Sequence, residues 1–493
     1  MLPPPRASNH LTALLRADLT GWTPETVRQQ LGDPAHNALE RGQTMPARHR
    51  LTGNSDAAAM LTRIYLLEET VSADDVAAAH PNLGICGAIQ LGIITESRTR
   101  YGDGYRAAIK LEPHGRWWVA SDQGTPTETE HVIGIGGATR SLLQQTPRER
   151  VDSALDMGAG CGIQSMYLST HAKHVTATDI SERACAYARF NMELNDIHNV
   201  TVRCGSLFEP VSGETFDLIV TNPPFVITPR NLRGRGKLEY RDGGMERDQL
   251  VAHVISVGPS HLKPGGHLQM IGNWETRRGQ THWADPVRAW LETATDAVAP
   301  DGLRAWVAQR DSVDITQYAE LWLSDAQRHH QWDEDYQTWI EDFESAEVER
   351  IGMGAVAVRR DPNVEGLMLL AEERSAGEIP DGKHVKRTLD HLQLADNWQQ
   401  WHLRQHEDLW EQRLLRPGSS DVSVIKLALG AETVRVSSTT AALVGASDGE
   451  LSCEQIIVAL AALTGSDQSD LAEQVSTEIP TLLRAGMVDI VTQ

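Results

Sequence analysis

The chain has 493 residues, of which 40% are hydrophobic and 23% charged, and its formal net charge is −22 at pH 7. This length predicts roughly two to four domains, and the composition is globular rather than disordered or fibrous. The acidity excludes a protein that wraps nucleic acid with its whole surface, because such binding requires cations that neutralise phosphates. Any contact with RNA would have to come from a local basic patch.

The chain shows no sequence signal for secretion or for a membrane span. No apolar run approaches the roughly 18 residues that a span needs, and the first residues, MLPPPRASNHL, lack the apolar segment of a signal peptide. The cysteines lie far apart without a CxxC pair, which argues against disulfides and zinc and favours a reducing compartment. They are Cys86, Cys161, Cys185, Cys204 and Cys453. We therefore expect a cytoplasmic protein with no membrane partner.

Residues 1–127 are predicted to form a small helical, winged-helix-like domain. Helical patterns in SDAAAMLTRIYLLEE, VSADDVAAAH and GICGAIQL precede TRYGDGYRAAIKL, which is typical of a hairpin with Asp103-Gly104 at its turn. The cations near this hairpin either grip phosphates or pack on the next domain. They are Arg98, Arg100, Arg106, Lys110 and Arg116.

Residues 128–362 alternate apolar strands with amphipathic helices, which predicts a Rossmann-like, doubly wound α/β domain. The strands are expected in SALDMG, HVTATDI, VTVRCG, FDLIVT, HLQMIGN, RAWVAQRD and GAVAVRRD. A Trp-rich acidic stretch near 315–346 is predicted to be a helical insertion between the last two strands.

Residues 363–493 are predicted to form a mostly helical, winged-helix-like C-terminal domain. The stretch HLQLADNWQQWHLRQHEDLWEQRLL (391–415) is expected to be one long polar helix, and the patterns that follow suggest helix, helix and strand. Two histidine pairs, His329-His330 and His402 with His406, lack a third ligand nearby, so no metal site is predicted.

The segment ALDMGAGCG is typical of a nucleotide-binding turn, because Gly158, Gly160 and Gly162 allow a tight backbone and the following helix offers free amides. Asp179 ends the next strand, where a carboxylate can bind both hydroxyls of a ribose. Asp156, before the glycines, would repel a pyrophosphate but suits a ligand with an ammonium and a sulfonium. This charge pattern favours S-adenosylmethionine over NAD.

Residues of roughly 130–310 resemble the class I S-adenosylmethionine (SAM)-dependent methyltransferases. The glycine turn, Asp179, the turn CGSLF and the motif NPPF follow in the family's order. The resemblance implies S-adenosyl-L-methionine as the cofactor, and Ser206 stands where many relatives carry an Asp that bonds the adenine amine. The cofactor would be held by Asp156, Gly158, Gly160, Gly162, Asp179, Ile180, Ser206, Leu207 and Asn222.

The motif NPPF follows a buried strand, and prolines do not belong inside a central strand. At the carboxyl end of a parallel strand the motif faces the ligand crevice. The Asn222 side-chain oxygen and the Pro223 carbonyl can each accept one N–H of a planar NH2 group, while Pro224 and Phe225 complete the motif with a rigid turn and a flat ring. We therefore predict N-methylation of an amine conjugated to a π system, catalysed at these four positions.

Two substrate classes remain open at this stage. NPPF followed by a Gly243-Gly244 pair resembles the HemK/PrmC-type glutamine methyltransferases, which implies a protein partner such as a translation factor or ribosomal protein. NPPF with a phenylalanine also resembles ribosomal-RNA guanine methyltransferases that act on structured RNA, as a transfer-RNA or ribosomal-RNA base enzyme would. The stretch RNLRGRGK, with Arg230, Arg233 and Arg235, places cations beside the site. A non-catalytic SAM-binding scaffold is a minor alternative, and the oligomeric state is not predicted.

The segment HVIGIGGATRSLLQQTPR (131–148) lies before the first strand of the α/β domain. It is glycine-rich and then helical, and it is either a wall of the donor or substrate pocket or a plain linker. In the first case Arg140 would face the site.

Overall fold

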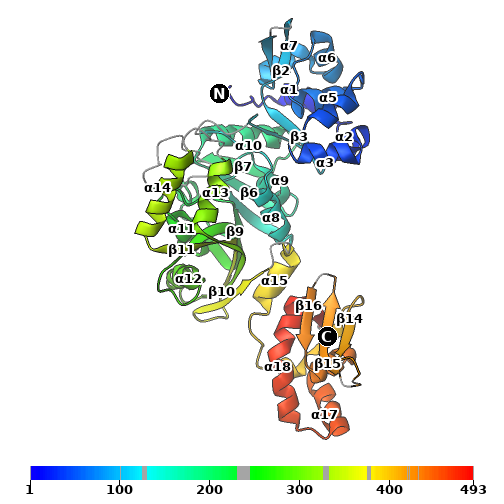
Figure 1. The fold of residues 1–493 in the computed structure, drawn as a ribbon, viewed down its shortest axis with the longest axis vertical. Coiled ribbons are helices and arrows are strands. Elements are labelled where there is room, and N and C mark those ends of the chain that lie inside the picture. The colour runs from blue at the N-terminus through cyan, green and yellow to red at the C-terminus, as the bar shows by residue number, and fades with distance from the viewer. Residues whose placement is uncertain are drawn as a thin grey trace.

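The structure is a computed structural model that describes residues 2–99, 102–124, 130–229, 245–325, 332–374, 379–418, 420, 422–430 and 432–491. Three regions follow one another along the long axis of the molecule (Figure 1). A helical N-terminal region lies at one end, a large sheet with its helices in the middle, and a smaller C-terminal unit at the other end.

The N-terminal region consists of short helices followed by two hairpins. Its elements are α1 (Asn9–Leu19), α2 (Pro24–Leu31), α3 (Asp33–Glu40), α4 (Met45–Leu51), α5 (Ala57–Tyr65), α6 (Ala73–Ala79), α7 (Gly84–Leu91), β1 (Ile94–Thr99), β2 (Gly102–Ala107), β3 (Lys110–His114) and β4 (Trp117–Ser121). Helix α6 begins at a capping box, in which Ser72 and Asp75 bond each other's backbone N–H. The order of three helices and a hairpin is compatible with the winged-helix-like prediction, which stays a prediction.

The turn predicted at Asp103-Gly104 is wrong, because both residues lie inside β2, opposite Arg98 and Ser97. Thr99 pairs with Gly102, and positions 100 and 101 between them lie outside the described residues. Gly104 is required for another reason: a Cβ there would lie 2.7 Å from the carbonyl oxygen of Val71, whose backbone bridges to Tyr105. The glycine therefore permits a close strand approach rather than a turn.

The described cations near the first hairpin differ in their surroundings. Arg98 and Arg106 are exposed, whereas Lys110 pairs with Glu112 at 3.0 Å and Arg116 lies over the ring of Trp117. Arg100 lies outside the described residues. Helix α7 carries no Lys or Arg.

The central region is built on an eight-stranded sheet in the order β12-β10-β11-β9-β8-β5-β6-β7. Strands β9, β8, β5, β6 and β7 run parallel, whereas β11 is antiparallel to both of its neighbours. The strands are β5 (Val151–Met157), β6 (Ala172–Asp179), β7 (Val200–Cys204), β8 (Phe216–Thr221), β9 (Leu262–Arg277), β10 (Gly302–Asp314), β11 (Val348–Asp361) and β12 (Leu367–Glu373). This mixed α/β sheet confirms the predicted fold class.

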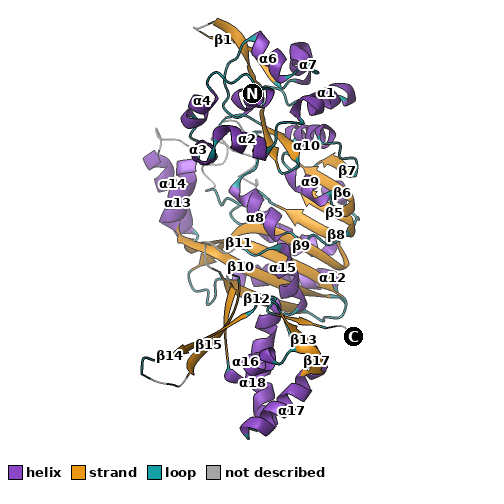
Figure 2. Ribbon diagram, turned by 90° about the vertical axis from the view of Figure 1, so that its right-hand side faces the viewer, coloured by secondary structure: helices purple, strands orange, loops and turns teal. Residues whose placement is uncertain are grey.

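Helices cover both faces of the sheet (Figure 2). Helices α8 and α9 pack on the face that carries Ala154 and Ile271, and α11 and α12 pack on the face that carries Leu155 and Met270. The helices of this region are α8 (Gly137–Gln145), α9 (Ile163–Leu168), α10 (Glu182–Leu194), α11 (Gln249–Val257), α12 (Asp285–Val298), α13 (Ile315–Asp325) and α14 (Trp332–Ser345).

Strand β9 continues beyond the end of β8. The last β8 residue, Thr221, pairs with Met270, but β9 runs on to Arg277 and stays paired with β11. Helices α13 and α14, in the stretch predicted as an insertion, connect β10 to β11 and pack against β11 around Tyr318 and Trp339. The Tyr318 hydroxyl also bonds Asn273 of the β9 extension. The extension thus forms a platform beside the NPPF motif.

The C-terminal unit contains α15 (Gly382–Asp390), β13 (His402–Gln405), β14 (Trp410–Leu415), β15 (Val422–Leu429), β16 (Glu432–Val436), α16 (Ser438–Gly445), β17 (Asp448–Ser452), α17 (Cys453–Thr464), α18 (Gln468–Arg484) and β18 (Val488–Ile490). Its strands form two three-stranded sheets, β17-β13-β18 and β14-β15-β16. Strand β12 lies beyond the boundary predicted at 362, yet it belongs to the large sheet. The unit therefore mixes strands and helices rather than being mostly helical.

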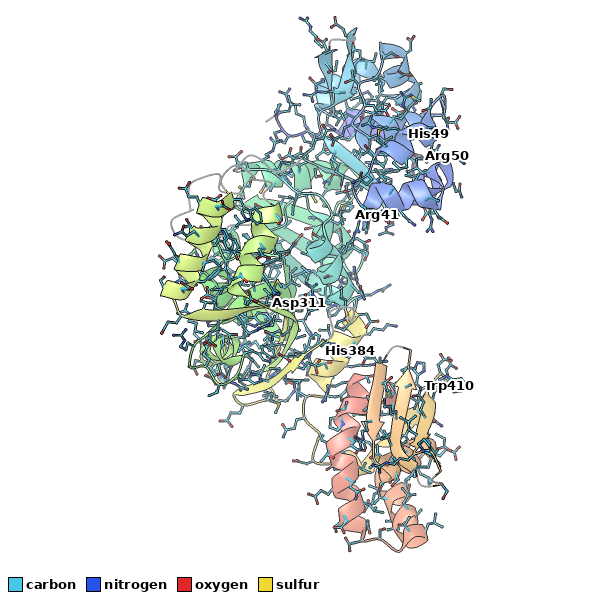
Figure 3. The ribbon with its side chains drawn as sticks, viewed as in Figure 1. Arg41, His49, Arg50, Asp311, His384 and Trp410 are labelled. Atoms are coloured by element: carbon cyan, nitrogen blue, oxygen red, sulfur yellow. The ribbon has the colours of Figure 1, made fainter. Side chains whose placement is uncertain are left out.

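The long helix predicted over 391–415 is wrong. Residues 391–415 instead contain a short 3-10 turn at Trp398–Gln400 and the two strands β13 and β14, with loops between them. Leu403 on β13 enters the C-terminal core, whereas β14 is exposed throughout and Trp410 projects outward (Figure 3). The polar residues and spaced tryptophans imitate a helical period, but pairing with β15, β17 and β18 decides the conformation.

None of the helices that the structure describes is long and apolar enough to cross a membrane. Within the described ranges, no group of three His, Cys, Asp or Glu side chains is placed to hold a metal ion. His329 and His330 lie outside those ranges.

Candidate active site

The glycine turn follows β5 and lies against the end of β6. The N–H groups of Gly158 and Ala159 both donate to the carbonyl oxygen of Thr178, at 2.8 and 2.9 Å. All three glycines have positive φ angles, and Gly162 packs directly on α10, where an added Cβ would lie 3.3 Å from Cα of Ala188. The turn therefore needs glycine both for its backbone and for this contact.

Asp156 lies in the buried part of β5 and is only 1% exposed. Its Oδ2 atom accepts hydrogen bonds from the backbone N–H of Ser165 at 2.8 Å and from the Ser165 hydroxyl at 2.6 Å. Burial raises the pKa of Asp156 to about 7, and the nearby Asp179 acts in the same direction. A cationic ligand group at this position would favour the ionised form.

Asp179 lies at the carboxyl end of β6 and connects the turns around it. Its carboxylate accepts the N–H of Gly160 and the N–H of Ser181, both at 2.9 Å, and burial raises its pKa. The next residue, Ile180, is 65% exposed although it lies beside this buried acid. An apolar side chain left exposed at the crevice is a suitable contact for a flat, partly apolar ligand group.

Ser206 and Leu207 follow β7 in the turn predicted to hold the adenine. The N–H of Gly205 donates to the carbonyl oxygen of Asp179 at 2.9 Å, which places this turn beside the end of β6. Leu207 has a positive φ of 47° and packs against the core on the α11 face. Of the two residues, Ser206 is therefore the one whose polar side chain is available to a ligand.

Asn222 and Pro223 leave β8 next to the glycine turn, since the Asn222 carbonyl oxygen is the nearest atom to the Cβ position of Gly158, at 3.8 Å. Pro223 is buried. The Asn222 Oδ1 atom is also buried, and it has no hydrogen-bond partner among the described residues. Because a buried acceptor without a donor is costly, this atom is suited to accept an N–H from a bound ligand or substrate.

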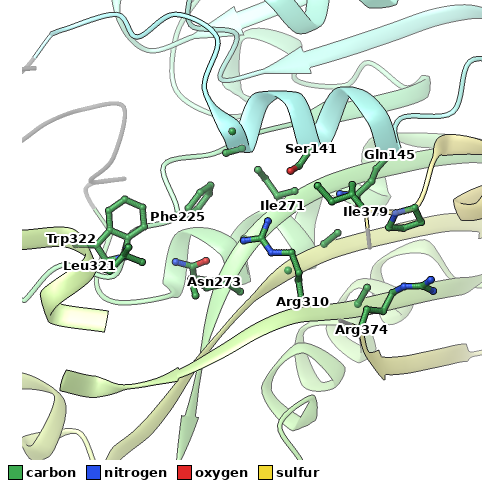
Figure 4. A pocket seen from close by; sticks show the side chains of 18 residues that line it. Ser141, Gln145, Phe225, Ile271, Asn273, Arg310, Leu321, Trp322, Arg374 and Ile379 are labelled. Carbon is green, nitrogen blue, oxygen red and sulfur yellow. The ribbon is translucent and has the colours of Figure 1, made fainter. Parts of the chain in front are cut away.

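Phe225 borders a cleft of about 300 Å³ on the α8 face of the sheet (Figure 4). We call it the Phe225 cleft. One side is α8, the floor is β9, β10 and β11, and the far wall is α13. Its main lining side chains are Ser141, Gln145, Phe225, Ile271, Asn273 and Trp322.

The structure does not bring every predicted residue to this site. Arg140 is exposed and is not part of the cleft wall; its charge instead lowers the pKa of His114, after the larger effect of burial. The α8 segment does form a wall, through Ser141 and Gln145. Arg230, Arg233, Arg235 and the Gly243-Gly244 pair lie outside the described residues.

Sequence reasoning missed Gln145, Asn273 and Trp322. They come from α8, β9 and α13, and only the sheet order brings them together. The helical period of the segment around Gln145 was visible, but which of its faces meets the sheet was not.

The arrangement defines a class of protein: a Rossmann-like sheet with a glycine turn, an acid after β6 and an amide after β8 at one edge. Residues 133–281 match the family described as "Methyltransferase small domain". The chain thus carries a class I methyltransferase domain, and the predicted resemblance is confirmed. Residues 19–108 match a family described as "Domain of unknown function (DUF7059)".

The chain is similar to curated methyltransferases of two kinds. It is 31% identical over 191 residues to the ribosomal protein uL3 glutamine methyltransferase of Bradyrhizobium diazoefficiens, and 32% identical over 151 residues to the release factor glutamine methyltransferase of Xylella fastidiosa. It is 28% identical over 142 residues to the ribosomal RNA small subunit methyltransferase C of Alcanivorax borkumensis.

These three matches cover 37%, 28% and 29% of this chain, and 57%, 54% and 38% of the relatives. The chain therefore spans about half the length of the curated relatives it matches, or less.

The residues present fit S-adenosylmethionine, the cofactor of this class. The residues next to the glycine turn provide two acid groups, an exposed apolar side chain and a buried amide oxygen without a partner among the described residues. These site residues include no lysine or arginine that could bind a pyrophosphate. Asp156, Asp179, Ile180 and Ser206 are the side chains that would hold it.

Proposed function

We propose that the protein is a SAM-dependent N-methyltransferase that acts on a planar NH2 group, with a glutamine side chain of a protein as the leading substrate. The observation that carries the proposal is the Asn222 Oδ1 atom. It is buried, and it has no partner in the described part of the chain. Its residue lies next to the glycine turn through its carbonyl oxygen and stands three positions before Phe225, which lines the cleft. A substrate N–H would satisfy it.

In this mechanism the cofactor supplies an electrophilic methyl group, and the chain positions the amine. Asn222 Oδ1 accepts one N–H and the carbonyl oxygen of Pro223 accepts the other. These two bonds fix the nitrogen and favour the less conjugated form that bond formation requires. Pro224 makes the turn rigid and Phe225 offers a flat face to the planar group. The product loses its extra proton after transfer, so a strong general base is not needed.

Three observations support a protein substrate. The described cations of the Phe225 cleft are engaged by acids, the net charge is −22, and two of the compared relatives are named glutamine methyltransferases. A phosphate-rich partner would meet little free positive charge in the described part of the site.

The second candidate is an RNA base as substrate. It is favoured by the similarity to the ribosomal RNA small subunit methyltransferase C and by the basic stretch RNLRGRGK, which lies outside the described residues. A non-catalytic scaffold remains the minor alternative, and an inactive wild-type protein that still binds the donor would favour it.

The central experiment replaces Asn222 by Ala. We expect methyl transfer to fall by at least about 100-fold, as when a transition-state hydrogen-bond acceptor or donor is removed, while the donor Kd measured by calorimetry changes by less than about threefold. Asn363→Ala, at an exposed turn at the far end of the sheet, is the matched control and should leave both values unchanged. If the Asn222 variant lost donor binding as well, the motif would be structural.

The substrate class is tested with a tritiated donor and an extract from cells that lack the gene. Label released by protease supports the proposal. Label released by ribonuclease supports the RNA alternative.

A further inference from the structure

The Phe225 cleft extends from Phe225 over the floor that β9, β10 and β11 form (Figure 4). The Phe225 ring belongs both to the methyl-transfer site and to the cleft, because it is part of NPPF and also lies against Trp322 of α13, with ring centroids 6.4 Å apart. A group in the cleft would therefore lie next to the group that is methylated. Two neighbouring residues of one polypeptide chain could fill these two places.

The cleft is mostly apolar. Ile271 and Met353 on the floor and Leu321 and Trp322 on the α13 wall provide hydrophobic contacts. Its volume of about 300 Å³ lies at the lower end of the range for small-molecule pockets, and it is large enough for one bulky side chain with its backbone.

The two cations among the described lining residues are already paired. Arg310 forms an ion pair with its neighbour Asp311, and Arg374 bonds Glu372 at 3.0 Å and Glu432 at 2.7 Å. A phosphate in the cleft would meet the carboxylates as well as the cations. This charge balance disfavours a nucleotide and favours an uncharged occupant.

Two buried polar atoms of the described cleft-lining residues have no partner in the described ranges. One is Nε of Arg374, whose other guanidinium nitrogens bond Glu372 and Glu432. The other is Oε1 of Gln145, a residue that is only 6% exposed and lies one helical turn after Ser141 on α8. An acceptor of this kind needs an N–H from an occupant. A polypeptide backbone provides such a donor at every residue except proline.

The opposite wall is fixed in position before any substrate binds. The hydroxyl of Tyr318 on α13 accepts the amide N–H of Asn273 at 2.8 Å and the backbone N–H of Ile227 at 3.0 Å. These bonds tie α13 to β9 and to the segment just after NPPF. The insertion is therefore a preformed wall rather than a loose appendage.

We propose that the Phe225 cleft binds an apolar side chain adjacent to the target glutamine in a substrate polypeptide, and that Gln145 accepts an N–H of that polypeptide's backbone. The inference rests on the proposed function and adds to it a determinant of substrate sequence in α8 and α13.

The test uses the full-length protein and short synthetic peptides with a central glutamine flanked by Leu, Phe or Asp. Transfer from a tritiated donor gives kcat/KM, and fluorescence anisotropy of labelled peptides gives Kd. We expect the wild type to prefer Leu or Phe neighbours over Asp by about tenfold or more.

Two variants locate this preference. Ala138→Phe fills the cleft from α8, and Ala138→Ser is its matched control. Gln145→Met keeps the side-chain volume but removes the acceptor. We expect both Ala138→Phe and Gln145→Met to raise the peptide Kd and KM by about tenfold while the donor Kd stays within about threefold, and Ala138→Ser to resemble the wild type.

The outcomes separate the two claims. Glutamine peptides methylated equally well whatever their neighbours, or equally well by all variants, would overturn the inference and leave the proposed function standing. If no glutamine peptide were methylated and RNA accepted the label instead, both would fail. A loss of donor binding in Ala138→Phe would indicate misfolding of that variant, and Gln145→Met then decides alone.

Discussion

The buried carboxyl group of Asp156 connects the electrostatics of the site to pH. Its pKa of about 7 lies well above the value of about 3.9 for an unfolded aspartate, so between these values the folded chain holds a proton that the unfolded chain releases. The unfolding free energy that this group contributes is therefore greatest below about pH 4 and is lost as the pH rises toward 7. We expect Asp156→Asn to remove this loss.

The measurement is the thermal midpoint of both proteins without donor. The stability of Asp156→Asn relative to the wild type should rise between pH 5 and pH 8. Equal pH profiles for the two proteins would show that Asp156 is ionised throughout.

Donor affinity should depend on pH in the opposite direction to stability, and the cause is again the ionisation of Asp156. A ligand ammonium near Asp156 favours the carboxylate, so the wild type should bind donor more tightly at pH 8 than at pH 6 and release a proton on binding at the lower pH. Calorimetry in two buffers of different ionisation enthalpy measures this proton. Asp156→Asn should show neither effect, whereas a cofactor cation far from Asp156 would leave the two proteins alike.

Among individual residues, the sequence best predicted the site residues whose position depends only on the end of a strand. Gly158, Asp179 and Asn222 each stand at the end of a parallel strand, and such ends meet at one edge of the sheet. Arg140 shows the limit, because its position on α8 could be predicted but not the face that α8 turns toward the sheet.

The contact between α9 and α10 depends on a single missing side chain. Gly162→Ala must adopt a positive φ of 84° and also meets Ala188 and Met192 at 3.0 to 3.3 Å, whereas Gly213, with φ 78°, has open space around its Cβ position. We expect Gly213→Ala to cost about 1–2 kcal/mol for its backbone alone, and Gly162→Ala about 1–3 kcal/mol more. Urea denaturation compares them. Equal costs would mean that α10 simply moves aside.

Two asparagines on α10 hold the N-terminal region to the central sheet domain. Asn191 bonds the N–H and the carbonyl of Ala120 on β4, and Asn195 does the same for Trp118, all at 2.8 to 2.9 Å. Asn191 is fully buried and also donates to the carbonyl oxygen of Cys161 in the glycine turn, at 2.8 Å. It is therefore a positioning residue that links β4 to the candidate donor site.

Asn195 lacks this bond to the glycine turn, so the two asparagines form a matched pair for mutation. Both Asn191→Ala and Asn195→Ala should lower stability, by about 2–4 kcal/mol for the buried Asn191 and less for the partly exposed Asn195. Only Asn191→Ala should also weaken donor binding, by up to about tenfold, because only it loses the bond to the turn. Calorimetry of donor binding checks the second claim, which equal donor affinities of the two variants would contradict.

Elements defined by tertiary pairing were the least predictable. The stretch 391–415 has the polar, Trp-spaced look of a helix, yet Leu403 is buried only because β13 pairs with β17 and β18, far along the chain. The NPPF motif was easier, because prolines after an apolar run end a strand whatever surrounds it.

At the scale of the whole molecule, the N-terminal region and the methyltransferase domain are not independent. One hydrophobic core contains Trp22, Ile64 and Leu91 together with Ile163 and Phe190 of α9 and α10. The sequence pattern changes near residue 127, so a domain boundary could be predicted there. The shared core could not be predicted, because it forms only when the two regions pack against each other. The C-terminal unit, by contrast, has a separate core that includes Leu443 and Val475.

The charge of the whole molecule offers the last test between a protein and an RNA substrate. Arg233 and Arg235 lie in the basic stretch after NPPF, whereas Arg41 and Arg50 lie exposed on the N-terminal region (Figure 3). Replacing either pair by Gln changes the net charge equally, so a protein substrate bound through the Phe225 cleft should be methylated by both double variants within about threefold of the wild type, as expected for solvent-exposed charges.

An RNA substrate would respond differently, because each phosphate contact adds about 0.9 to the slope of log K against log salt for a duplex and about 0.7 for a single strand. Loss of Arg233 and Arg235 would then weaken RNA binding and flatten its salt dependence, whereas loss of Arg41 and Arg50 would not. Binding measured over a range of salt concentrations compares the pairs. We expect no such difference, because the cleft next to the reacting group presents cations that are paired with acids, apolar walls and the unpartnered amide oxygen of Gln145, which together suit a peptide and not a phosphate chain.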